Sequence, residues 1–304
     1  MVVLLGLALM TLIVVDFASE SGLGFALAAN QSNEVRAYYL ARSAIGVGLA
    51  LLAQSSRIQA MSQSQQIADT LQDVWAVPFP PLPLDGGQVS LGIVDEARKV
   101  DINLLITNKG NVNPQQEQIL ERLFTILNVD PRIIPAIVDW LDPDSIESPG
   151  GAESDYYLRL KPPYQARNGP MPTIGDLKMI MGVDDVVFNR ISPFLTVMPE
   201  TQVNANTAPP EVLAALDPQL MEDNQAVKEI IAARAIRPFT AITDVANLVD
   251  VTSFGTRLTK VLTVRSQFFT ITGAGTYAGT RKIVSATFHR ELTGTGTLTA
   301  WHED

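Results

Sequence analysis

The N-terminal 60 residues most constrain what this chain can become. No charged side chain precedes Asp16, and no proline occurs between Met1 and Val77. Proline is the residue that most strongly interrupts helical hydrogen bonding, so one continuous helix is possible here. From Phe17 onward, apolar residues recur at spacings of three and four, as they do on an amphipathic helix. The sequence therefore predicts one helix over residues 1–60, with a lipid-like first half and a second half that packs on a domain.

Other interpretations of this apolar run fit the sequence less well. A full membrane span needs about 20 apolar residues, and the uncharged run is shorter than that. A secretory signal peptide would show a basic start and a small-residue cleavage site, and neither is present. A buried core helix of a soluble protein is the remaining alternative, but an apolar start that becomes one-sided is more typical of an anchor leading into a globular head.

Charge and composition exclude several classes of function. The formal net charge is −10 and the isoelectric point is about 4.7, which argues against broad binding to nucleic acid or anionic membranes. The chain has no cysteine, so it can form neither disulfides nor thiolate metal sites. Its only histidines, His289 and His302, lie near the C-terminus, which makes a histidine-based catalytic centre or zinc site a poor expectation.

The order of the remaining patterns predicts an α+β fold. Alternating apolar residues predict strands over 88–105, with Val100, Ile102 and Leu104 in the second of them, and over 262–292 around a glycine-rich turn, GAGTYAGT. Short helices with proline-marked starts fill the stretch between, and Asn206 or Thr207 is the expected N-cap of one of them. The tail after residue 292 is expected to be frayed.

The simplest arrangement packs the long helix on one antiparallel sheet. We expect residues 1–60 to form the membrane helix, residues 61–106 and 259–304 the α/β scaffold, and residues 107–258 an inserted all-α domain. Tyr38, Tyr39 and Leu40 are expected to pack against the sheet.

An acidic loop, DWLDPDSIESPGGAESDYY, carries the densest cluster of chemistry-bearing residues. The carboxylate oxygens of its aspartates and glutamates are hard ligands that suit Ca²⁺, although their spacing does not match the EF-hand pattern. A solvated acidic turn, with Asp142 and Asp144 capping helices, and an acid/base pair beside Trp140 and nearby tyrosines are the alternatives. Glu147 is the weakest of the acids as a ligand. The candidate metal ligands are Asp139, Asp142, Asp144, Glu153 and Asp155.

A second motif raises a different class of function. NANTAPPEVLAALDP followed by VKEIIAARAIRPF resembles a helix-hairpin-helix DNA-binding unit, and a membrane-anchored DNA-uptake protein is therefore the alternative function. Such units contact phosphates through a glycine-containing hairpin backed by basic residues. Here the hairpin lacks glycine and carries Asp217, Glu222 and Asp223, so we expect a structural unit and no nucleic acid partner.

Several stretches resemble the minor pseudopilin K family of type II secretion (general secretion pathway protein K), over essentially the whole chain. These are RAYYLARSA, VDEARKVDINLL, DWLDPDS followed by GAESDYY and PPY, and VNANTAPPEVLAAL. The resemblance implies a non-enzymatic, pilin-like protein at the tip of the pseudopilus, with minor pseudopilins I and J as partners. It also implies Ca²⁺ in the acidic loop. The expected location is the bacterial inner membrane, single-pass through residues 2–15, with the globular part in the periplasm; secreted substrates are further candidate partners.

Two departures from the general pilin pattern accompany this resemblance. A short basic leader is missing, so the chain is expected to start inside the mature helix. The glutamate that most pilins carry near the mature N-terminus is also missing, as in the K family. Because that glutamate is held to pair with the N-terminal amine of a neighbouring subunit, its absence fits a subunit at the tip.

Overall fold

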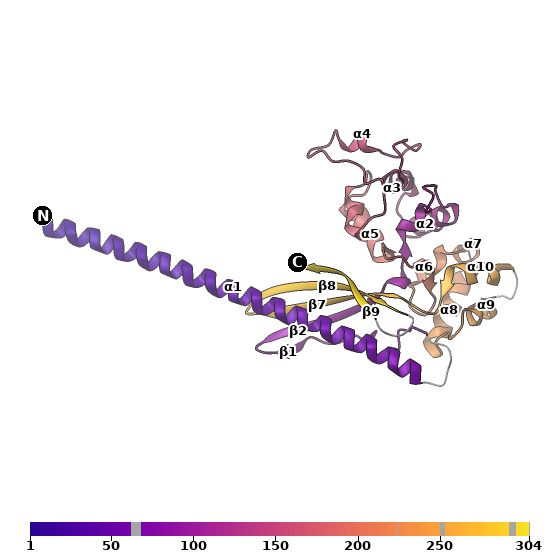
Figure 1. The fold of residues 1–304 in the computed structure, drawn as a ribbon, viewed down its shortest axis with the longest axis horizontal. Helices are drawn as coiled ribbons and strands as arrows, with labels where there is room; N and C mark the ends of the chain where they lie inside the picture. The colour runs from indigo at the N-terminus through magenta and orange to yellow at the C-terminus, as the bar shows by residue number, and fades with distance from the viewer. Residues whose placement is uncertain (62–67, 223, 250–252, 292–295, 304) are drawn as a thin grey trace.

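A single long helix, a five-stranded sheet and a cluster of short helices make up the molecule (Figure 1). The computed structural model describes residues 1–61, 68–222, 224–249, 253–291 and 296–303. Helix α1 (Val2–Met61) extends far beyond the rest of the chain at its N-terminal end. Among the described residues it is the one helix that is long and apolar enough to cross a membrane, judged by length and composition alone.

The predicted long helix is confirmed, but it meets the domain later than expected. Ala37 is the first buried residue in the described part of α1. The amphipathic pattern begins at Phe17, yet the side chains of Phe25 and Leu27 within it are 78% and 60% exposed. From Ala37 onward the buried positions follow helical spacing and face the sheet: Ala37, Leu40, Ala41, Ala44, Ile45, Leu52 and Ser55.

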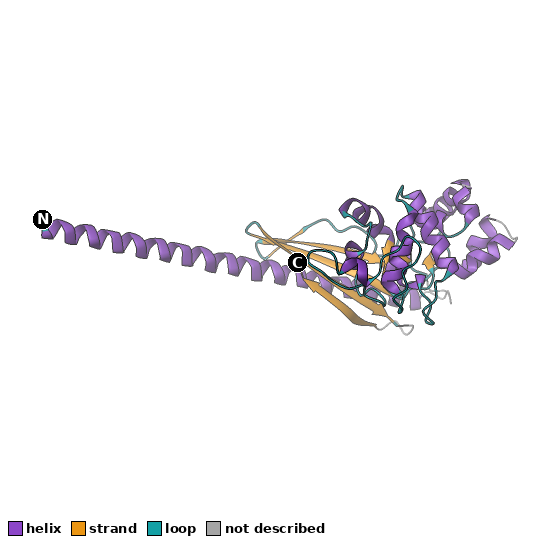
Figure 2. Cartoon of the chain, turned by 90° about the horizontal axis from the view of Figure 1, so that it is seen from above, coloured by secondary structure: helices purple, strands orange, loops and turns teal. Residues whose placement is uncertain are grey.

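The sheet is antiparallel throughout and lies against the C-terminal half of α1 (Figure 2). Its strand order is β1-β2-β7-β8-β9. Two-residue turns join β1 to β2 and β7 to β8, and their residues Asp85, Gly86, Ala278 and Gly279 all have positive φ, as tight hairpin turns require. The strands are β1 (Leu82–Leu84), β2 (Gly87–Asp95), β7 (Phe268–Tyr277), β8 (Thr280–Arg290) and β9 (Gly296–Glu303).

Helix α1 approaches β7 so closely that two positions of the strand have no room for a side chain. A Cβ at Gly273 would lie 2.2 Å from the carbonyl oxygen of Ala41, and one at Gly275 would lie 2.1 Å from that of Ala37. Further along the same interface the side chains are large, and Trp75 packs edge-on against Phe269 with ring centroids 5.2 Å apart. The distance between α1 and the sheet is therefore set by small residues near one end of the sheet and by aromatic residues near the other.

The helical domain is inserted between two neighbouring strands of this sheet. Asp95 at the end of β2 is paired with Phe269 at the start of β7, so everything between them leaves and returns at the same end of one strand pair. Residues Val100, Ile102, Leu105 and Leu262 belong to the core of this domain and not to that of the scaffold. The domain limits expected at 107 and 258 therefore move outward, to Glu96 and Gln267.

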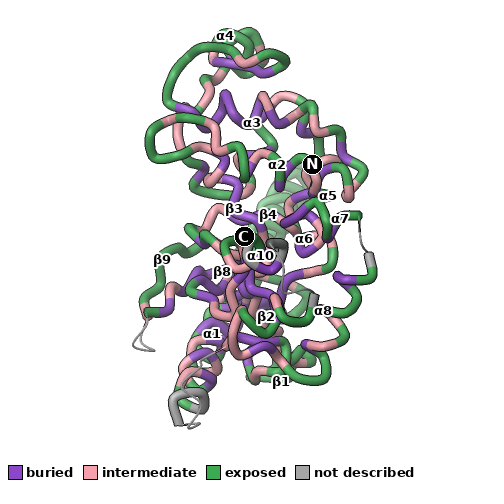
Figure 3. The backbone as a smooth tube through the Cα atoms, turned by 90° about the vertical axis from the view of Figure 1, so that its right-hand side faces the viewer, coloured by how far each residue is buried: buried purple, intermediate pink, exposed green. Residues whose placement is uncertain are grey.

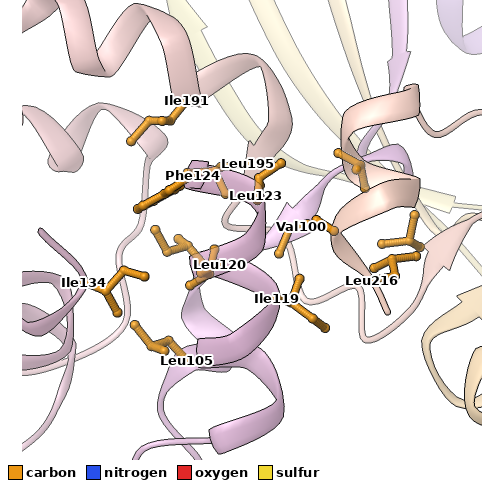
Figure 4. Close-up of a cluster of buried hydrophobic side chains, with 14 of the residues drawn as sticks. Val100, Leu105, Ile119, Leu120, Leu123, Phe124, Ile134, Ile191, Leu195 and Leu216 are labelled. Atoms are coloured by element: carbon orange, nitrogen blue, oxygen red, sulfur yellow. The ribbon is translucent and has the colours of Figure 1, made fainter. Parts of the chain in front are cut away.

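Short helices form the inserted domain around one apolar core. In Figure 4 the residues of α2 face Leu105, Ile134, Ile191 and Leu216 from four other segments. Two short parallel strand pairs, β3–β4 and β5–β6, lie within the domain. Its elements are η1 (Glu96–Arg98), β3 (Val100–Asp101), η2 (Ile102–Leu105), α2 (Pro114–Ile126), η3 (Pro131–Ile133), α3 (Ile134–Leu141), α4 (Ser154–Tyr157), η4 (Ile174–Met179), α5 (Asp185–Ile191), η5 (Ser192–Phe194), β4 (Leu195–Thr196), β5 (Val203–Asn204), α6 (Pro210–Ala215), α7 (Pro218–Glu222), α8 (Asn224–Ile236), α9 (Ile242–Val249), α10 (Ser253–Val261) and β6 (Leu262–Thr263).

Two local predictions in and beside this domain were wrong. The expected second strand through Leu104 ends at Asp101, whose side chain accepts from the backbone N–H of Asn103 at 2.9 Å and starts the 3-10 turn η2. Neither Asn206 nor Thr207 caps helix α6, which has Pro209 at its N-cap. Asn206 instead exchanges hydrogen bonds of 2.9 Å with the backbone of Phe239.

Three expectations for the scaffold also need correction. The residues Gly273–Tyr277 of the expected glycine-rich turn continue β7, and the chain reverses only at Ala278 and Gly279. Residues 296–303 of the tail, expected to be frayed, pair with β8 as strand β9; residues 292–295 lie outside the described part. Tyr39 is 59% exposed and not packed on the sheet, whereas Leu40 is buried.

The α1–β7 contact predicts that Gly273→Ala lowers the free energy of unfolding by about 2 kcal/mol, because the added methyl group forces helix and strand apart. Urea unfolding of the soluble fragment 30–304 measures this, since residues 3–29 contain no buried side chain. Gly92→Ala is the matched control: a Cβ there has no atom within 4 Å, so its change should stay within about 0.5 kcal/mol. Equal effects of the two substitutions would contradict this description of the contact.

Candidate metal centre

The acidic loop joins the end of α3 to the start of α4, at the end of the inserted domain where exposed segments gather (Figure 3). Asp142 has extended backbone and is the C-cap of α3. Glu153 is the N-cap of α4 and accepts from the backbone N–H of Ser154 at 3.2 Å. Gly150, with φ +85°, lets the loop turn back between them. The two helix ends thus carry one carboxylate each into the same place.

Three carboxylates converge in this loop. Asp142, Asp144 and Glu153 each offer an oxygen atom, and these atoms lie within 4.8 Å of one another. Asp142 and Glu153 are only 7% and 4% exposed, whereas Asp144 is exposed. Oδ1 of Asp142 and Oε1 of Glu153 are buried without a hydrogen-bond partner. Buried carboxylate oxygens without donors are unfavourable, so the arrangement fits a bound cation.

Asn168 is a further polar residue beside the acidic loop that the sequence analysis did not single out. Its Nδ2 donates to the backbone carbonyl of Asp144, and its Oδ1 is also buried without a partner. Asn168 has φ +49° and precedes Gly169. The Asn-Gly pair is a turn signal in the sequence, but nothing in the sequence indicates that this turn reaches the acidic loop 24 residues earlier.

The other two expected ligands lie outside the three-carboxylate group. Asp139 is fully buried, and both of its oxygens accept from the backbone N–H of Ser148 at 3.1 Å. A Cβ at Gly151 would lie 2.0 Å from Oδ2 of Asp139. Asp139 therefore contacts the loop at Ser148 and Gly151 and fixes its path. Asp155 is exposed in the first turn of α4.

Burial and neighbouring like charges both disfavour the ionised carboxylates of the loop. Burial, and then the charges of Asp144 and Asp139, raise the pKa of Asp142 to about 6. Burial is also the main cause of the raised pKa of Glu153, with the three aspartates adding to it. Carboxyl groups that protonate this easily are short of positive charge. The donors are all hard oxygens, which suits Ca²⁺ and gives no site for a metal that prefers sulfur or imidazole.

Two aromatic residues of this region, Trp140 and Tyr157, belong to the core, whereas Tyr156 is exposed. Trp140 and Tyr157 are buried and pack edge-on at 5.2 Å, and Tyr164 stacks on Tyr157 at the same centroid distance. Trp140 and Tyr157 are therefore not exposed platforms of the kind that a carbohydrate site would need.

One basic side chain of the helix-hairpin-helix-like unit, that of Arg234, points inward, whereas Lys228 and Arg237 are exposed. Arg234 is buried and donates to the backbone carbonyls of Ala205 and Ala208 at 2.8 Å. Asp217 is buried and pairs with Arg257 at 2.8 Å. Glu222 is exposed, and Asp223 lies outside the described residues.

Because the pKa of Asp142 is raised, the free energy of unfolding of the metal-free protein should depend on pH. A carboxyl whose folded pKa exceeds its unfolded value stabilises the fold at low pH, and this contribution is lost as the pH rises through about 6. In chelator at pH 8, Asp142→Asn should therefore raise the free energy of unfolding by about 1 to 2 kcal/mol, measured by urea unfolding. The exposed Asp155→Asn is the control and should change little. A destabilised Asp142→Asn variant under these conditions would contradict the electrostatic description.

Comparison with known proteins assigns the chain to a family. Two family models, both described as Type II secretion system (T2SS), protein K, match residues 98–200 and 203–265 and together cover more than half of the chain. The type II secretion system protein K of Pseudomonas aeruginosa is 27% identical over 303 residues, covering 96% of this chain and 88% of that protein. The corresponding protein of Klebsiella pneumoniae is 26% identical, covering 80% of this chain and 76% of that protein.

The fold is also similar to that of a solved structure. A chain of the crystal structure of the GspK-GspI-GspJ complex from the enterotoxigenic Escherichia coli type 2 secretion system superimposes with a TM-score of 0.76. The two chains are 20% identical, and the match covers 91% of this chain and 99% of the other. The sequence matches and the shared α+β fold lead to one conclusion: the chain belongs to the type II secretion system protein K family, whose members are pseudopilins.

Proposed function

We propose that this chain is the minor pseudopilin at the tip of the pseudopilus, where it forms a complex with minor pseudopilins I and J and supports protein secretion across the outer membrane. In this proposal α1 anchors the chain in the bacterial inner membrane before assembly, and the globular part lies in the periplasm. The role is one of assembly and not of catalysis.

The position of the inserted domain carries this proposal. The domain lies beyond the end of the sheet that is remote from the free N-terminal half of α1 (Figures 1 and 2). In pilin-like filaments the long helices pack along the filament axis, so a second subunit would have to enter above this end of the sheet. A bulky domain of about 170 residues occupies that space, which supports a place where no subunit follows.

The partners follow from the same family relationship. The solved relative was crystallised with GspI and GspJ, and we propose that the corresponding pseudopilins bind this chain. The DNA-uptake alternative has less support. Arg234 on α8 is used internally, although Lys228 and Arg237 nearby are exposed, and the net charge of −10 opposes phosphate binding.

We further propose that the loop holds Ca²⁺ through Asp142, Asp144 and Glu153, with the amide oxygen of Asn168 as an additional donor. The unpartnered buried oxygens of Asp142, Glu153 and Asn168 support this. When bound, the ion neutralises the carboxylates and ties the end of α3 to the start of α4. Asp139 shapes the loop through Ser148 and Gly151, and Asp155, exposed on α4, is the least supported of the expected ligands.

Calcium binding predicts a thermal shift of the soluble fragment 30–304. Ligand at 100 times its Kd should add about 2.7 kcal/mol, which corresponds to roughly 5 °C or more in Tm relative to excess chelator. The shift should vanish in Asp142→Ala/Asp144→Ala and persist in Asp155→Ala. No shift in the parent fragment would leave the acids as a solvated turn and remove the calcium proposal.

The tip proposal predicts that the scaffold alone cannot support secretion. Because Asp95 and Phe269 are paired neighbours, residues 97–266 can be replaced by a four-residue turn that closes β2 onto β7. The shortened chain should retain helix and sheet by circular dichroism, while secretion in a host lacking its own protein K falls to background. The control is the full chain expressed at the same level. Normal secretion with the shortened chain would contradict a role for the inserted domain at the tip.

A further inference from the structure

Three buried carboxylates lie where the inserted domain meets the scaffold. Asp95 is the last residue of β2, Asp69 lies in the segment after α1, and Glu200 lies between β4 and β5. Their exposed fractions are 1%, 0% and 8%. We call this group the junction acids. They are far along the chain from the acidic loop and take no part in the proposed calcium site.

Glu200 and Asp95 each accept hydrogen bonds across the junction. Oε1 of Glu200, on the inserted side, accepts from the backbone N–H groups of Gln267 at 2.7 Å and Phe268 at 2.8 Å, where β7 begins. Oδ2 of Asp95, on the scaffold side, accepts from Thr207 Oγ1 at 2.6 Å and Asn204 Nδ2 at 3.1 Å. Carboxylates therefore make the polar contacts that hold the two bodies together here.

Asp69 completes the group from the segment after α1. Its Oδ2 accepts from the backbone N–H of Ser266 at 2.8 Å and from Nη2 of Arg290. Its backbone carbonyl accepts from Asn204 Nδ2 at 3.1 Å. All three acids thus converge on the short segments 200–207 and 266–268.

Three basic groups at the junction have partners other than Glu200 and Asp95. Arg290 pairs with Asp69, Lys99 pairs with Glu96 at 2.9 Å, and the guanidinium of Arg234 donates to carbonyls. A cavity of about 200 Å³ beside Glu200 is lined by Arg265, Arg290 and Glu291. The charged groups around the junction acids, from every segment packed there, are Asp73, Glu96, Arg98, Lys99, Asp101, Arg234, Lys260, Arg265, Arg290 and Glu291.

We propose that the junction is a proton-controlled latch: protonated Glu200 holds the inserted domain in the observed orientation, and ionisation of Glu200 beside Asp95 and Asp69 loosens it. The bonds from Gln267 and Phe268 end on one oxygen of Glu200, so the other oxygen can carry the proton without breaking them. The device would let the pH around the protein set how rigidly the inserted domain is carried on the pilin scaffold.

The electrostatics give the direction and size of the effect. Burial raises the pKa of Glu200 from 4.5 to about 7; the hydrogen bonds from Phe268 and Gln267 act against this rise, and the charges of Asp95 and Asp69 add to it. Burial likewise raises the pKa of Asp95 to about 6. Because the pKa of Glu200 is higher in the closed state, protonated Glu200 stabilises that state at low pH. This stabilisation is lost as the pH rises through about 7. If the open state restores the ordinary pKa, the opening equilibrium constant rises about 30-fold between pH 5.5 and pH 8.

Hydrogen exchange of the unaltered full chain, in detergent and with chelator present, tests the proposal without any substitution. The protection factors of the Gln267 and Phe268 amides, corrected for the chemical exchange rate at each pH, should fall by about 30-fold from pH 5.5 to pH 8. Ile271, paired with Ile93 in the middle of β7, is the internal reference and should keep its protection. Equal protection of Gln267 and Phe268 at both pH values would overturn the latch.

A charge-neutral variant shows whether Glu200 is the group that titrates. Glu200→Gln keeps a side-chain oxygen that can accept both N–H groups but cannot ionise, so its protection should be the same at both pH values. Glu121→Gln, at an exposed site on α2, is the matched control and should behave like the parent. A pH-dependent loss of protection that persists in Glu200→Gln would overturn the assignment.

Spin-label distances report whether the domain orientation itself responds. The chain has no cysteine, so Gln88→Cys on β2 and Gln118→Cys on α2, both exposed, give labels at two known sites only. One narrow distance distribution at pH 5.5 should broaden at pH 8, with an unchanged circular dichroism spectrum, and should remain narrow when Glu200→Gln is added. An identical distribution at both pH values would overturn a movement of the domain.

Discussion

The close packing of α1 on β7 is the constraint on which the rest of the structure depends. Gly273 and Gly275 leave no room for a side chain beneath the carbonyls of Ala41 and Ala37, so helix and strand can meet in one arrangement. This contact orients the sheet along the helix and separates a free apolar half of α1 from a half that carries the globular part. The molecule consequently has two unlike ends, one suited to a membrane or filament core and one that bears the inserted domain (Figure 1).

The inserted domain depends on a second pairing, that of Asp95 with Phe269. Because the domain leaves and returns at this one point, its connection to the scaffold is narrow, and buried carboxylates make the polar contacts there. The acidic loop also buries negative charge, because Asp142 and Glu153 are buried and each has an oxygen without a hydrogen-bond partner. The cation proposed for the loop and the proton proposed for the junction would each relieve buried negative charge in an acidic protein.

Features that rest on long periodic patterns could be predicted from the sequence, and those that rest on distant contacts could not. The long helix, the α+β class and the acidic loop follow from spacing and composition. Val100, Ile102 and Leu104 alternate like a strand, but the Asp101 side chain caps Asn103 and makes a 3-10 turn. The limits of the inserted domain, the role of Asn168 and the strand formed by the tail depend on partners far along the chain, and local sequence carries no signal for them.

Family membership and shape support the proposed place at the end of a filament. In that proposal the free half of α1 packs with the helices of other pseudopilins, while the inserted domain lies at the opposite end of the molecule (Figure 2). The most direct measurement is immunogold electron microscopy of isolated pseudopili with antibodies against the inserted domain. The account predicts label at one end of each filament and none along the sides. Label distributed along the filament would contradict it, because the chain would then be an ordinary repeating subunit.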